Sequence, residues 1–466
     1  MHHDELAHWS KRAADWARDY HAGLRDRPVR PDLAPGDFRK LIDAPVPEQP
    51  EAIETIFDDF ARLVPDAMTH WQHPRFFAYF PANAAPVSML AEQLANAMAS
   101  QAMLWQTAPA ANEMEALVVD WMRDALGLPA DFTGTIHDSA TTATFSAVTT
   151  MRENALGFQG IGEGLSGAPT LRIYASAQTH SSVDKAVRLS GIGQNNLVKV
   201  AGKPDDPRYS MDPAALDAAI RADLEAGHKP AGVVLATGGT AIGACDDIAA
   251  CIDVARAHDL PTHVDAAWAG SAMICPEFRD LWAGVEKADS VVFNPHKWLG
   301  AQFDCSIQIL RDPGPQIQAM GLRPDYLQTP GADEIVNYNE WTLPLGRRFR
   351  ALKIWFLLRS EGLTGLRSRI RNHVAWANEA RDAIAALDGF EIVTEPILSL
   401  FSFAYRDDAT TARLLDAVNR DGRIYLTQTT HAGRYVIRMQ VGQFDVTRED
   451  VMMVPDVLNE IAGSLP

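Results

Sequence analysis

Apolar residues recur at helical spacing through the first 70 residues. In one stretch they are separated by alternating steps of three and four residues. Residues 53–64 repeat the pattern, and proline-rich segments separate the two stretches. The positions of the first stretch are Leu6, Trp9, Ala13, Trp16 and Tyr20. The pattern predicts amphipathic helices. Since the apolar stripe of such helices needs a surface to cover it, we expect a second subunit to take part.

From about residue 115 to 310 the pattern changes to short apolar runs that alternate with helical segments. The runs are "TGTIHDS", "LRIYAS", "LVKVA", "AGVVLAT", "PTHVDAA", "SVVFN" and "CSIQIL". This alternation predicts βαβ units, and therefore an α/β fold with a mostly parallel sheet covered by helices. After roughly residue 350 a helix, several strands and a last helix predict an α+β domain. We therefore expect an N-terminal helical dimerisation segment (1–85), a large α/β domain (86–350) and a C-terminal small domain (351–466).

Composition excludes several function classes. Acidic residues outnumber basic ones, 60 against 42, so the formal net charge of the 466 residues is -18, which argues against nucleic acid and anionic membrane as partners. Charged residues interrupt the start of the chain, and no apolar stretch reaches membrane-spanning length, so we expect a cytoplasmic protein. The cysteines at 245, 251, 275 and 305 form no CxxC pair. They suggest neither a disulfide framework nor a metal site.

Polar residues that can take part in catalysis or ligand binding follow the predicted strands. They are Ser139 with Thr141, His180, Thr240, Asp265 and Lys297. Ligands of open parallel sheets bind outside the carboxyl ends of the strands, so these residues are the first candidates for a site. Each one alone has an ordinary explanation, as a helix cap, a turn residue or a solvated surface group.

Together these residues meet the needs of one cofactor, pyridoxal 5′-phosphate (PLP). A lysine can form a Schiff base with its aldehyde, and an aspartate can pair with its ring nitrogen. Hydroxyl residues at a helix N-terminus can bind its phosphate. The span from Asp265 to Lys297 fits one crossover, with a helix expected near residues 276–287, so both side chains reach the same sheet edge. Asn294 and His296 lie beside the lysine and could reach the same phosphate.

Several long motifs resemble the group II PLP-dependent decarboxylases, and above all the aromatic L-amino acid decarboxylases. The motifs are "THVDAAWAGSAMICPEFRDLWAGVEKADSVVFNPHKWLG", "THWQHPRFFAYFPAN", "LWQTAPAANEMEALVVDWM", "AQTHSSVDKA" and "PLGRRFRALKIWFLLRSEG". The resemblance covers nearly the whole chain, with the motifs in the family's order. It implies fold type I of the PLP enzymes and a homodimer with its sites at the subunit interface.

The resemblance also assigns roles to individual residues. Lys297 would hold PLP covalently, Asp265 would pair with its ring nitrogen, and His180 would stack on the ring. The other residues that would contact the cofactor are Ala267, Thr240, Ser139, Ala140, Thr141, Asn294 and His296. Tyr326, in a loop rich in Pro, Gly and Asp, matches the family's proton donor to the substrate Cα. Relatives that make aldehydes often replace the tyrosine or the histidine, so retention of both favours simple decarboxylation.

The resemblance places an aromatic substrate pocket at Trp71, Tyr79, Phe80 and Pro81. In the family, a glycine at the position of Gly346 is found in enzymes that act on large aromatic substrates. It therefore favours an indole or another large ring. Ala82, Gln101 and Met103 depart from the animal dopa decarboxylases, and the missing hydroxyl at 82 argues against dopa. In the family, residues 101 and 103 reach into the neighbouring subunit's site. Gln101 either addresses a ring substituent or is a polar residue at the rim.

Other interpretations remain open from the sequence. They are an aromatic aldehyde synthase, a decarboxylase of a non-aromatic amino acid such as glutamate, diaminobutyrate or histidine, and a binding protein that kept the fold but lost its chemistry. A nucleotide-binding fold is weaker, because "TGGTAIG" does not follow the G-x-G-x-x-G spacing.

Overall fold

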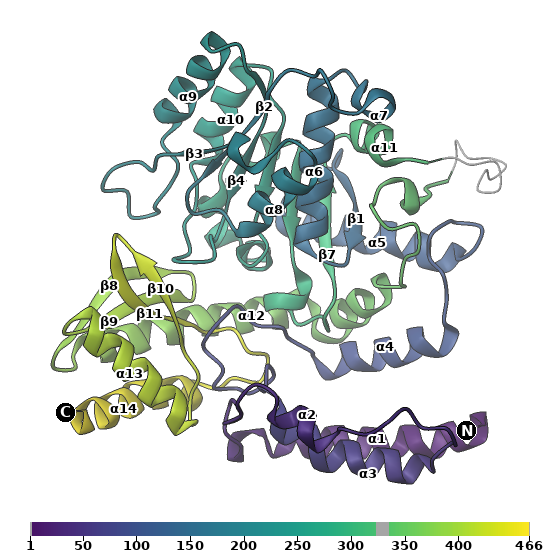
Figure 1. Cartoon of the computed structure of the whole chain (residues 1–466), viewed down its shortest axis with the longest axis vertical. Coiled ribbons are helices and arrows are strands. Elements are labelled where there is room, and N and C mark those ends of the chain that lie inside the picture. The colour runs from purple at the N-terminus through teal and green to yellow at the C-terminus, as the bar shows by residue number, and fades with distance from the viewer. Residues whose placement is uncertain (1, 323–334, 466) are drawn as a thin grey trace.

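The computed structural model describes residues 2–322 and 335–465 (Figure 1). At one end of the molecule the helices α1 (His3–Ala22), α2 (Asp37–Leu41) and α3 (Ile53–Leu63) lie together. Aromatic rings join α1 to α3, with Trp16 and Phe60 5.0 Å apart between ring centroids. Neither helix has a fully buried residue. The helices predicted from the first apolar stretches are therefore present, and their apolar faces are only partly covered within the chain.

The centre of the molecule is a seven-stranded sheet in the order β1-β7-β6-β5-β4-β2-β3. The strands are β1 (Thr133–His137), β2 (Leu171–Ser176), β3 (Leu197–Val200), β4 (Lys229–Ala236), β5 (Thr262–Asp265), β6 (Ser290–Phe293) and β7 (Ser306–Leu310). Only β7 runs antiparallel to its neighbours among these strands. The predicted α/β class and mostly parallel sheet are confirmed.

Helices cover both faces of this sheet. The helices of this part of the chain are α4 (Pro86–Met98), α5 (Pro109–Leu126), α6 (Ala140–Ala155), α7 (Gly160–Glu163), α8 (Ser181–Leu189), α9 (Pro213–Glu225), α10 (Ile248–Ala257) and α11 (Gly314–Met320). Of these, α4 lies away from the sheet (Figure 1). Neighbouring residues of β4 point to opposite faces: Val233 packs in the core with α9 and α10, and Val234 in the core with α6 and α8. Burial on both faces explains the continuous apolar runs in the sequence.

The crossover between β5 and β6 corrects one expectation. In place of the helix expected at residues 276–287, the chain forms 3₁₀ turns, η4 (Ala269–Ile274), η5 (Pro276–Trp282) and η6 (Val285–Lys287). Pro276 has no N–H to continue a helix from the preceding turn, and Gly284 takes φ +94°. The crossover still brings the ends of both strands to the same edge.

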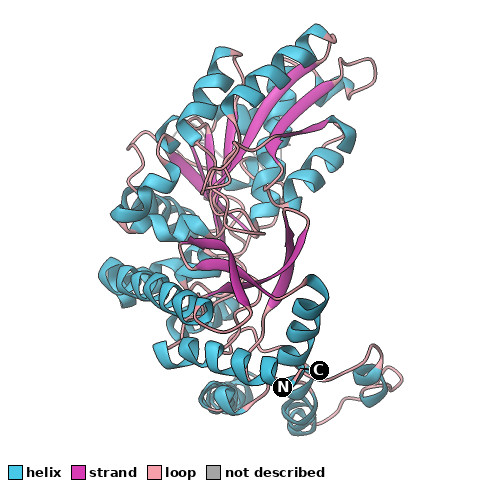
Figure 2. Cartoon of the chain, turned by 90° about the vertical axis from the view of Figure 1, so that its left-hand side faces the viewer, coloured by secondary structure: helices cyan, strands magenta, loops and turns pink. Residues whose placement is uncertain are grey.

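The C-terminal part has its own sheet, as the α+β prediction requires. Helix α12 (Ala351–Ala385), which is interrupted at Gly362, leads into β8 (Phe390–Ile397), β9 (Leu400–Tyr405), α13 (Asp408–Asp421), β10 (Thr427–His431), β11 (Arg434–Gln440) and α14 (Arg448–Ser464). The antiparallel order is β10-β11-β9-β8. Figure 2 shows the two sheets as separate layers of strands. Phe77, far away in sequence, packs into the core of this part.

Candidate active site

A cavity of about 280 Å³ lies at the carboxyl ends of the parallel strands. All ten residues predicted to contact a cofactor line it, although they come from five separate segments of the chain. They are Ser139, Ala140, Thr141, His180, Thr240, Asp265, Ala267, Asn294, His296 and Lys297. The fold therefore brings together the set that the sequence singled out.

Lys297 lies in a single π-helical turn, η7 (Pro295–Leu299), directly after β6. The next residue, Trp298, is fully buried, donates a hydrogen bond from Nε1 to Nδ1 of His373 (2.9 Å) and stacks on Trp268. Asn83 Nδ2 donates to the carbonyl oxygen of Lys297 (2.7 Å). These contacts fix the backbone of the turn, so the lysine side chain is held at the cavity.

Burial lowers the pKa of Lys297 to about 8. Asp265 opposes this shift because its negative charge favours the ammonium form, and the positive charge of Arg438 adds to it. An ordinary lysine has a pKa of about 10.4, so it carries almost no neutral amine near pH 7. The cavity therefore makes Lys297 a far better nucleophile than a surface lysine.

Asp265 is the last residue of β5 and is only 7% exposed. Its Oδ1 accepts a hydrogen bond from the backbone N–H of Ala267 (3.0 Å), which sets the direction of the carboxylate. Ala267 packs its small side chain against Ala140 and Val292. An acidic group placed in this way can pair with a protonated ring nitrogen.

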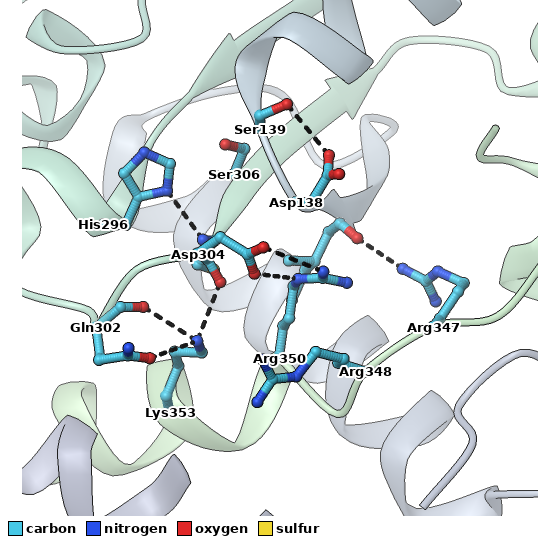
Figure 3. A network of polar contacts seen from close by, with 12 residues as sticks. Asp138, Ser139, His296, Gln302, Asp304, Ser306, Arg347, Arg348, Arg350 and Lys353 are labelled. Atoms are coloured by element: carbon cyan, nitrogen blue, oxygen red, sulfur yellow. Dashed lines mark hydrogen bonds and ion pairs between the residues drawn. The ribbon is translucent and has the colours of Figure 1, made fainter. Parts of the chain in front are cut away.

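The N-terminus of α6 faces the cavity with Ser139 as its cap. The Ser139 Oγ accepts from the backbone N–H of Thr142 (3.2 Å) and bonds to the carboxylate of Asp138 (Figure 3). The N–H groups of Ala140 and Thr141 belong to the first helical turn and have no intrahelical acceptor. Such a terminus favours an anion, as the phosphate of PLP requires.

Glycines form the turn after β4, at another wall of the cavity. Gly238 has φ +81°, and a Cβ on Gly239 would lie 2.7 Å from the carbonyl oxygen of Gln178. No larger residue fits at either position without a shift of the backbone. The turn presents Thr240 to the cavity.

His180 caps α8, and its Nδ1 accepts a hydrogen bond from the backbone N–H of Ser182 (3.1 Å). The neutral ring therefore carries its proton on Nε2. Burial lowers the pKa of His180; Asp265 opposes the shift and Lys297 adds to it. Because both of these charges act on the ring, His180 shares one electrostatic environment with the lysine and the aspartate.

The residues predicted for the substrate pocket fall into two groups. Phe80 lines the cavity and stacks on Trp268 at 4.5 Å between ring centroids. Tyr79 lines an adjoining cavity of about 360 Å³ with His180 and Thr240. Trp71 stacks on Tyr79 at 5.9 Å. The neighbouring Pro81 is buried, and the carbonyl oxygen of Ala82 accepts from the amide of Gln72.

Gln101, Met103 and Gly346 line neither cavity. They form a cluster of their own: the Arg347 N–H donates to Gln101 Oε1 (2.6 Å), and the Asn339 N–H donates to the carbonyl oxygen of Met103 (3.1 Å). A Cβ on Gly346 would lie 3.0 Å from Gln101 Nε2. Tyr326 lies outside the described residues, so its predicted role stays a prediction.

Sequence reasoning missed Trp268, Phe303 and Arg438. The first two line the main cavity. Arg438 is only 3% exposed, donates from Nη1 to the carbonyl oxygen of Ala78 (2.6 Å), and lines the adjoining cavity. Its Nε and Nη2 have no hydrogen-bond partner among the described residues. The sequence offered one signal for Arg438, namely that a charged residue stands within the apolar strand sequence "RYVIRMQVG".

Comparison with known proteins agrees with this geometry. Residues 35–406 match the pyridoxal-dependent decarboxylase conserved domain. The chain belongs to this family. The aromatic-L-amino-acid decarboxylase of Rattus norvegicus is 36% identical over 476 residues, covering 99% of this chain and 98% of its own. The phenylacetaldehyde synthase of Arabidopsis thaliana is 35% identical over 458 residues, and the alignment covers 95% of this chain and 92% of the relative.

A crystal structure of Oryza sativa TDC with PLP and tryptamine superposes on this decarboxylase with a TM-score of 0.96. The two chains are 32% identical, and the alignment covers 100% of this chain and 99% of the other. The fold is therefore fold type I of the PLP enzymes. PLP is the cofactor of the family, and the residues around Lys297 fit it: a lysine amine, a carboxylate, and a helix terminus for the phosphate.

Among the described residues, no helix is long and apolar enough to cross a membrane. The same part of the chain holds no group of three or more His, Cys, Asp or Glu side chains arranged for a metal ion. All four cysteines are buried and unpaired.

Proposed function

We propose that this PLP-dependent decarboxylase removes the carboxylate of aromatic L-amino acids in the Lys297 cavity, releasing carbon dioxide and the corresponding amine. The observation that carries the proposal is the convergence of Lys297, Asp265 and His180 on one cavity walled by Phe80 and Trp268. The stacked aromatic pair favours a planar, apolar substrate side chain. The names of the rat and Oryza sativa relatives support an aromatic substrate.

The residues of the cavity have different roles. Lys297 binds PLP covalently, and Asp265 holds a proton on its ring nitrogen. When bound, PLP supplies an electron sink for the pair of electrons that carbon dioxide leaves at the substrate Cα. His180 covers the ring, while the N–H groups of Ala140 and Thr141 bind the phosphate together with the Ser139 hydroxyl. Thr240, Asn294 and His296 complete the polar wall, and Tyr326 delivers the proton to Cα.

Arg438 receives the substrate carboxylate in the adjoining cavity. The support is its burial, its two unpartnered nitrogens and its position beside His180. A buried guanidinium with two unpartnered nitrogens is costly, and a carboxylate would satisfy both of them. Tyr79 lies in the same cavity wall and Trp71 stacks behind it. These rings contact the part of the substrate next to its carboxylate.

The enzyme acts as a cytoplasmic homodimer. The apolar faces of α1 and α3 are incompletely covered within the chain, which supports a second subunit that covers them. The cluster of Gln101, Met103 and Gly346 lies away from both cavities of its own chain. Its residues complete the substrate pocket of the neighbouring subunit, where Gly346 leaves room for a large ring.

An aldehyde synthase is the second candidate, because the Arabidopsis relative carries that name. In that reaction molecular oxygen takes two electrons from the substrate and becomes hydrogen peroxide, water supplies the oxygen of the aldehyde, and carbon dioxide and ammonia are released. Retention of Tyr326 and His180 favours the amine. We expect Tyr326→Phe to divert product from amine towards aldehyde and peroxide. An unchanged amine yield in this variant would count against Tyr326 as the proton donor.

Product analysis tests the proposal. The protein with PLP is incubated with equimolar Trp, Phe, Tyr, dopa, His and Glu, and the products are identified by mass spectrometry. We expect tryptamine or phenethylamine-type amines, and none from Lys297→Ala. Aldehydes from the wild type would favour the second candidate, and histamine or γ-aminobutyrate as the main product would overturn the aromatic assignment.

A further inference from the structure

His296 is held in one tautomer by the segment that follows the Lys297 turn. Residues 300–305 join this turn to β7, and the backbone N–H of Cys305 donates to Nδ1 of His296 (2.9 Å). Because Nδ1 accepts, the proton of the neutral ring lies on Nε2. Nε2 has no hydrogen-bond partner among the described residues, and the ring lines the Lys297 cavity.

The ring of His296 is also kept neutral. Burial lowers its pKa to about 3; the charges of Lys297 and Lys353 act in the same direction, while the negative charge of Asp304 opposes them. The ring of Phe303 packs edge-on against the imidazole at 4.8 Å between centroids. His296 is therefore a neutral Nε2–H donor with a fixed orientation, and not a general acid near pH 7.

Two cations at the start of α12 hold the segment that supplies the Cys305 N–H (Figure 3). Arg350 binds the carboxylate of Asp304 through Nε (2.7 Å) and Nη2 (3.4 Å). Lys353 Nζ donates to the backbone carbonyl oxygens of Gln302 and Asp304, each at 3.0 Å. The ammonium group thus bonds to the backbone on both sides of Phe303.

Lys353 is deeply buried, with a side chain 1% exposed, and its counter-ion is Glu92 at 2.5 Å. A buried ammonium is costly unless all of its hydrogen bonds are made, and two of its acceptors are carbonyl oxygens of this one segment. A second support comes from α4, where Ser88 Oγ accepts from the backbone N–H of Gln302 (2.7 Å). Any other conformation of residues 302–305 would leave Lys353 without these acceptors.

We propose that Lys353 and Arg350 are positioning residues that fix residues 302–305, so that the Cys305 N–H keeps His296 as an Nε2–H donor facing the cavity. The inference rests on the proposed function only in taking this cavity as the active site. Its readout is the state of one imidazole, which is independent of turnover, so its failure and that of the proposed function can be told apart.

The test is ¹⁵N NMR of the full-length protein labelled in histidine, with and without PLP. The His296 signals are assigned by their absence in His296→Gln. In the wild type we expect a single Nε2–H tautomer that does not titrate between about pH 5 and pH 8. In Lys353→Met we expect the two ring-nitrogen shifts to move towards each other, and the pKa to rise towards the ordinary value of about 6.5.

Arg348→Met is the matched control, because Arg348 pairs with the same Glu92 (2.6 Å) but makes no hydrogen bond to residues 302–305. It should leave the His296 signals unchanged, and Lys353→Arg should restore them in part. A wild-type Nδ1–H tautomer, or unchanged His296 signals in a folded Lys353→Met protein, would overturn the proposal.

Arg350→Met decides the matter if Lys353→Met does not fold, since it removes the second proposed positioning residue and its bonds to Asp304 but leaves Lys353 in place. We expect partial averaging of the two His296 nitrogen shifts in this variant. Shifts identical to the wild type would overturn the proposal here too.

Discussion

The ammonium nitrogen of Lys297 lies 5.1 Å from the centroid of the Phe80 ring. The guanidinium carbon of Arg438 lies 5.1 Å from the same centroid. One aromatic ring therefore contacts both buried cations of the site and attracts each of them through its π face. The two positive charges repel each other, which contributes to the lowered pKa of Lys297.

Covalent capture of PLP by the apoprotein should depend on pH with a midpoint of about 8. Only the neutral amine attacks an aldehyde, and the fraction of neutral Lys297 rises with pH through its pKa. Stopped-flow absorbance at pH values on both sides of the midpoint measures this rate. A rate that keeps rising until about pH 10.4 would show that Lys297 has an ordinary pKa.

Arg438→Met should shift this midpoint to higher pH, because a neighbouring positive charge no longer disfavours the ammonium form of Lys297. The same change should lower kcat/KM for the amino acid roughly 10- to 100-fold, the cost of losing a hydrogen bond to a charged group. Arg438→Lys should keep the midpoint and recover part of kcat/KM. A variant with an unchanged midpoint and unchanged kcat/KM would exclude Arg438 from the site.

Gly346→Ser should disfavour large rings. A Cβ at 346 would lie 3.0 Å from Gln101 Nε2, so the new side chain pushes the amide or takes its space. Steric differences of this size change selectivity roughly 10- to 200-fold, and we expect the kcat/KM ratio of tryptophan to tyrosine to fall within that range. Competition assays with both substrates measure the ratio.

The double variant Gly346→Ser/Gln101→Ala is the control for this prediction, because it removes the side chain that the new serine would crowd. It should return the tryptophan-to-tyrosine ratio towards the wild type. If Gly346→Ser leaves the ratio unchanged, residue 346 does not border the substrate ring.

Arg347→Met should destabilise the fold by about 3–5 kcal/mol, because it leaves a buried carboxylate without its partner. Arg347 pairs with Glu115 at 2.6 Å, and each side chain is 3% exposed. Arg347 also donates to the Thr135 hydroxyl and the Ile136 carbonyl of β1. Denaturant unfolding measures the change.

Arg348 is the comparison for Arg347, because its side chain is 55% exposed and its partner Glu92 also pairs with Lys353. Arg348→Met should therefore cost less than about 1 kcal/mol. Equal effects of the two substitutions would contradict the importance of burial. Replacing both partners, Arg347→Met with Glu115→Leu, should recover part of the loss.

The sequence predicted those parts of the structure in which local pattern and tertiary packing agree. The strands before Ser139 and Asp265, and the turn of Lys297, are marked by apolar runs followed by chemically distinctive residues. The family motifs then assigned these residues to one cavity, and all ten line it. Strand β8 gives a weaker signal in the sequence, because its burial alternates weakly, with partly covered residues on both faces.

Other features were hidden because they depend on contacts between distant segments. The 3₁₀ turns after β5 arise where a buried chain meets Pro276 and Gly284, although the residues between them resemble a helix. Arg438 becomes significant only because β11 carries it to Phe80. Likewise, the hydrogen bond from Cys305 to His296 involves a backbone N–H, which no side-chain pattern can reveal.

Reductive trapping tests the central claim most directly. The protein is incubated with PLP, reduced with borohydride, digested, and mapped by mass spectrometry. A Schiff base at the active site predicts one dominant phosphopyridoxyl group, attached to the peptide that contains Lys297, and its loss in Lys297→Met with the other lysines unmodified. Dominant labelling of a different lysine, or no labelling of Lys297, would contradict the assignment of this cavity as the site of catalysis.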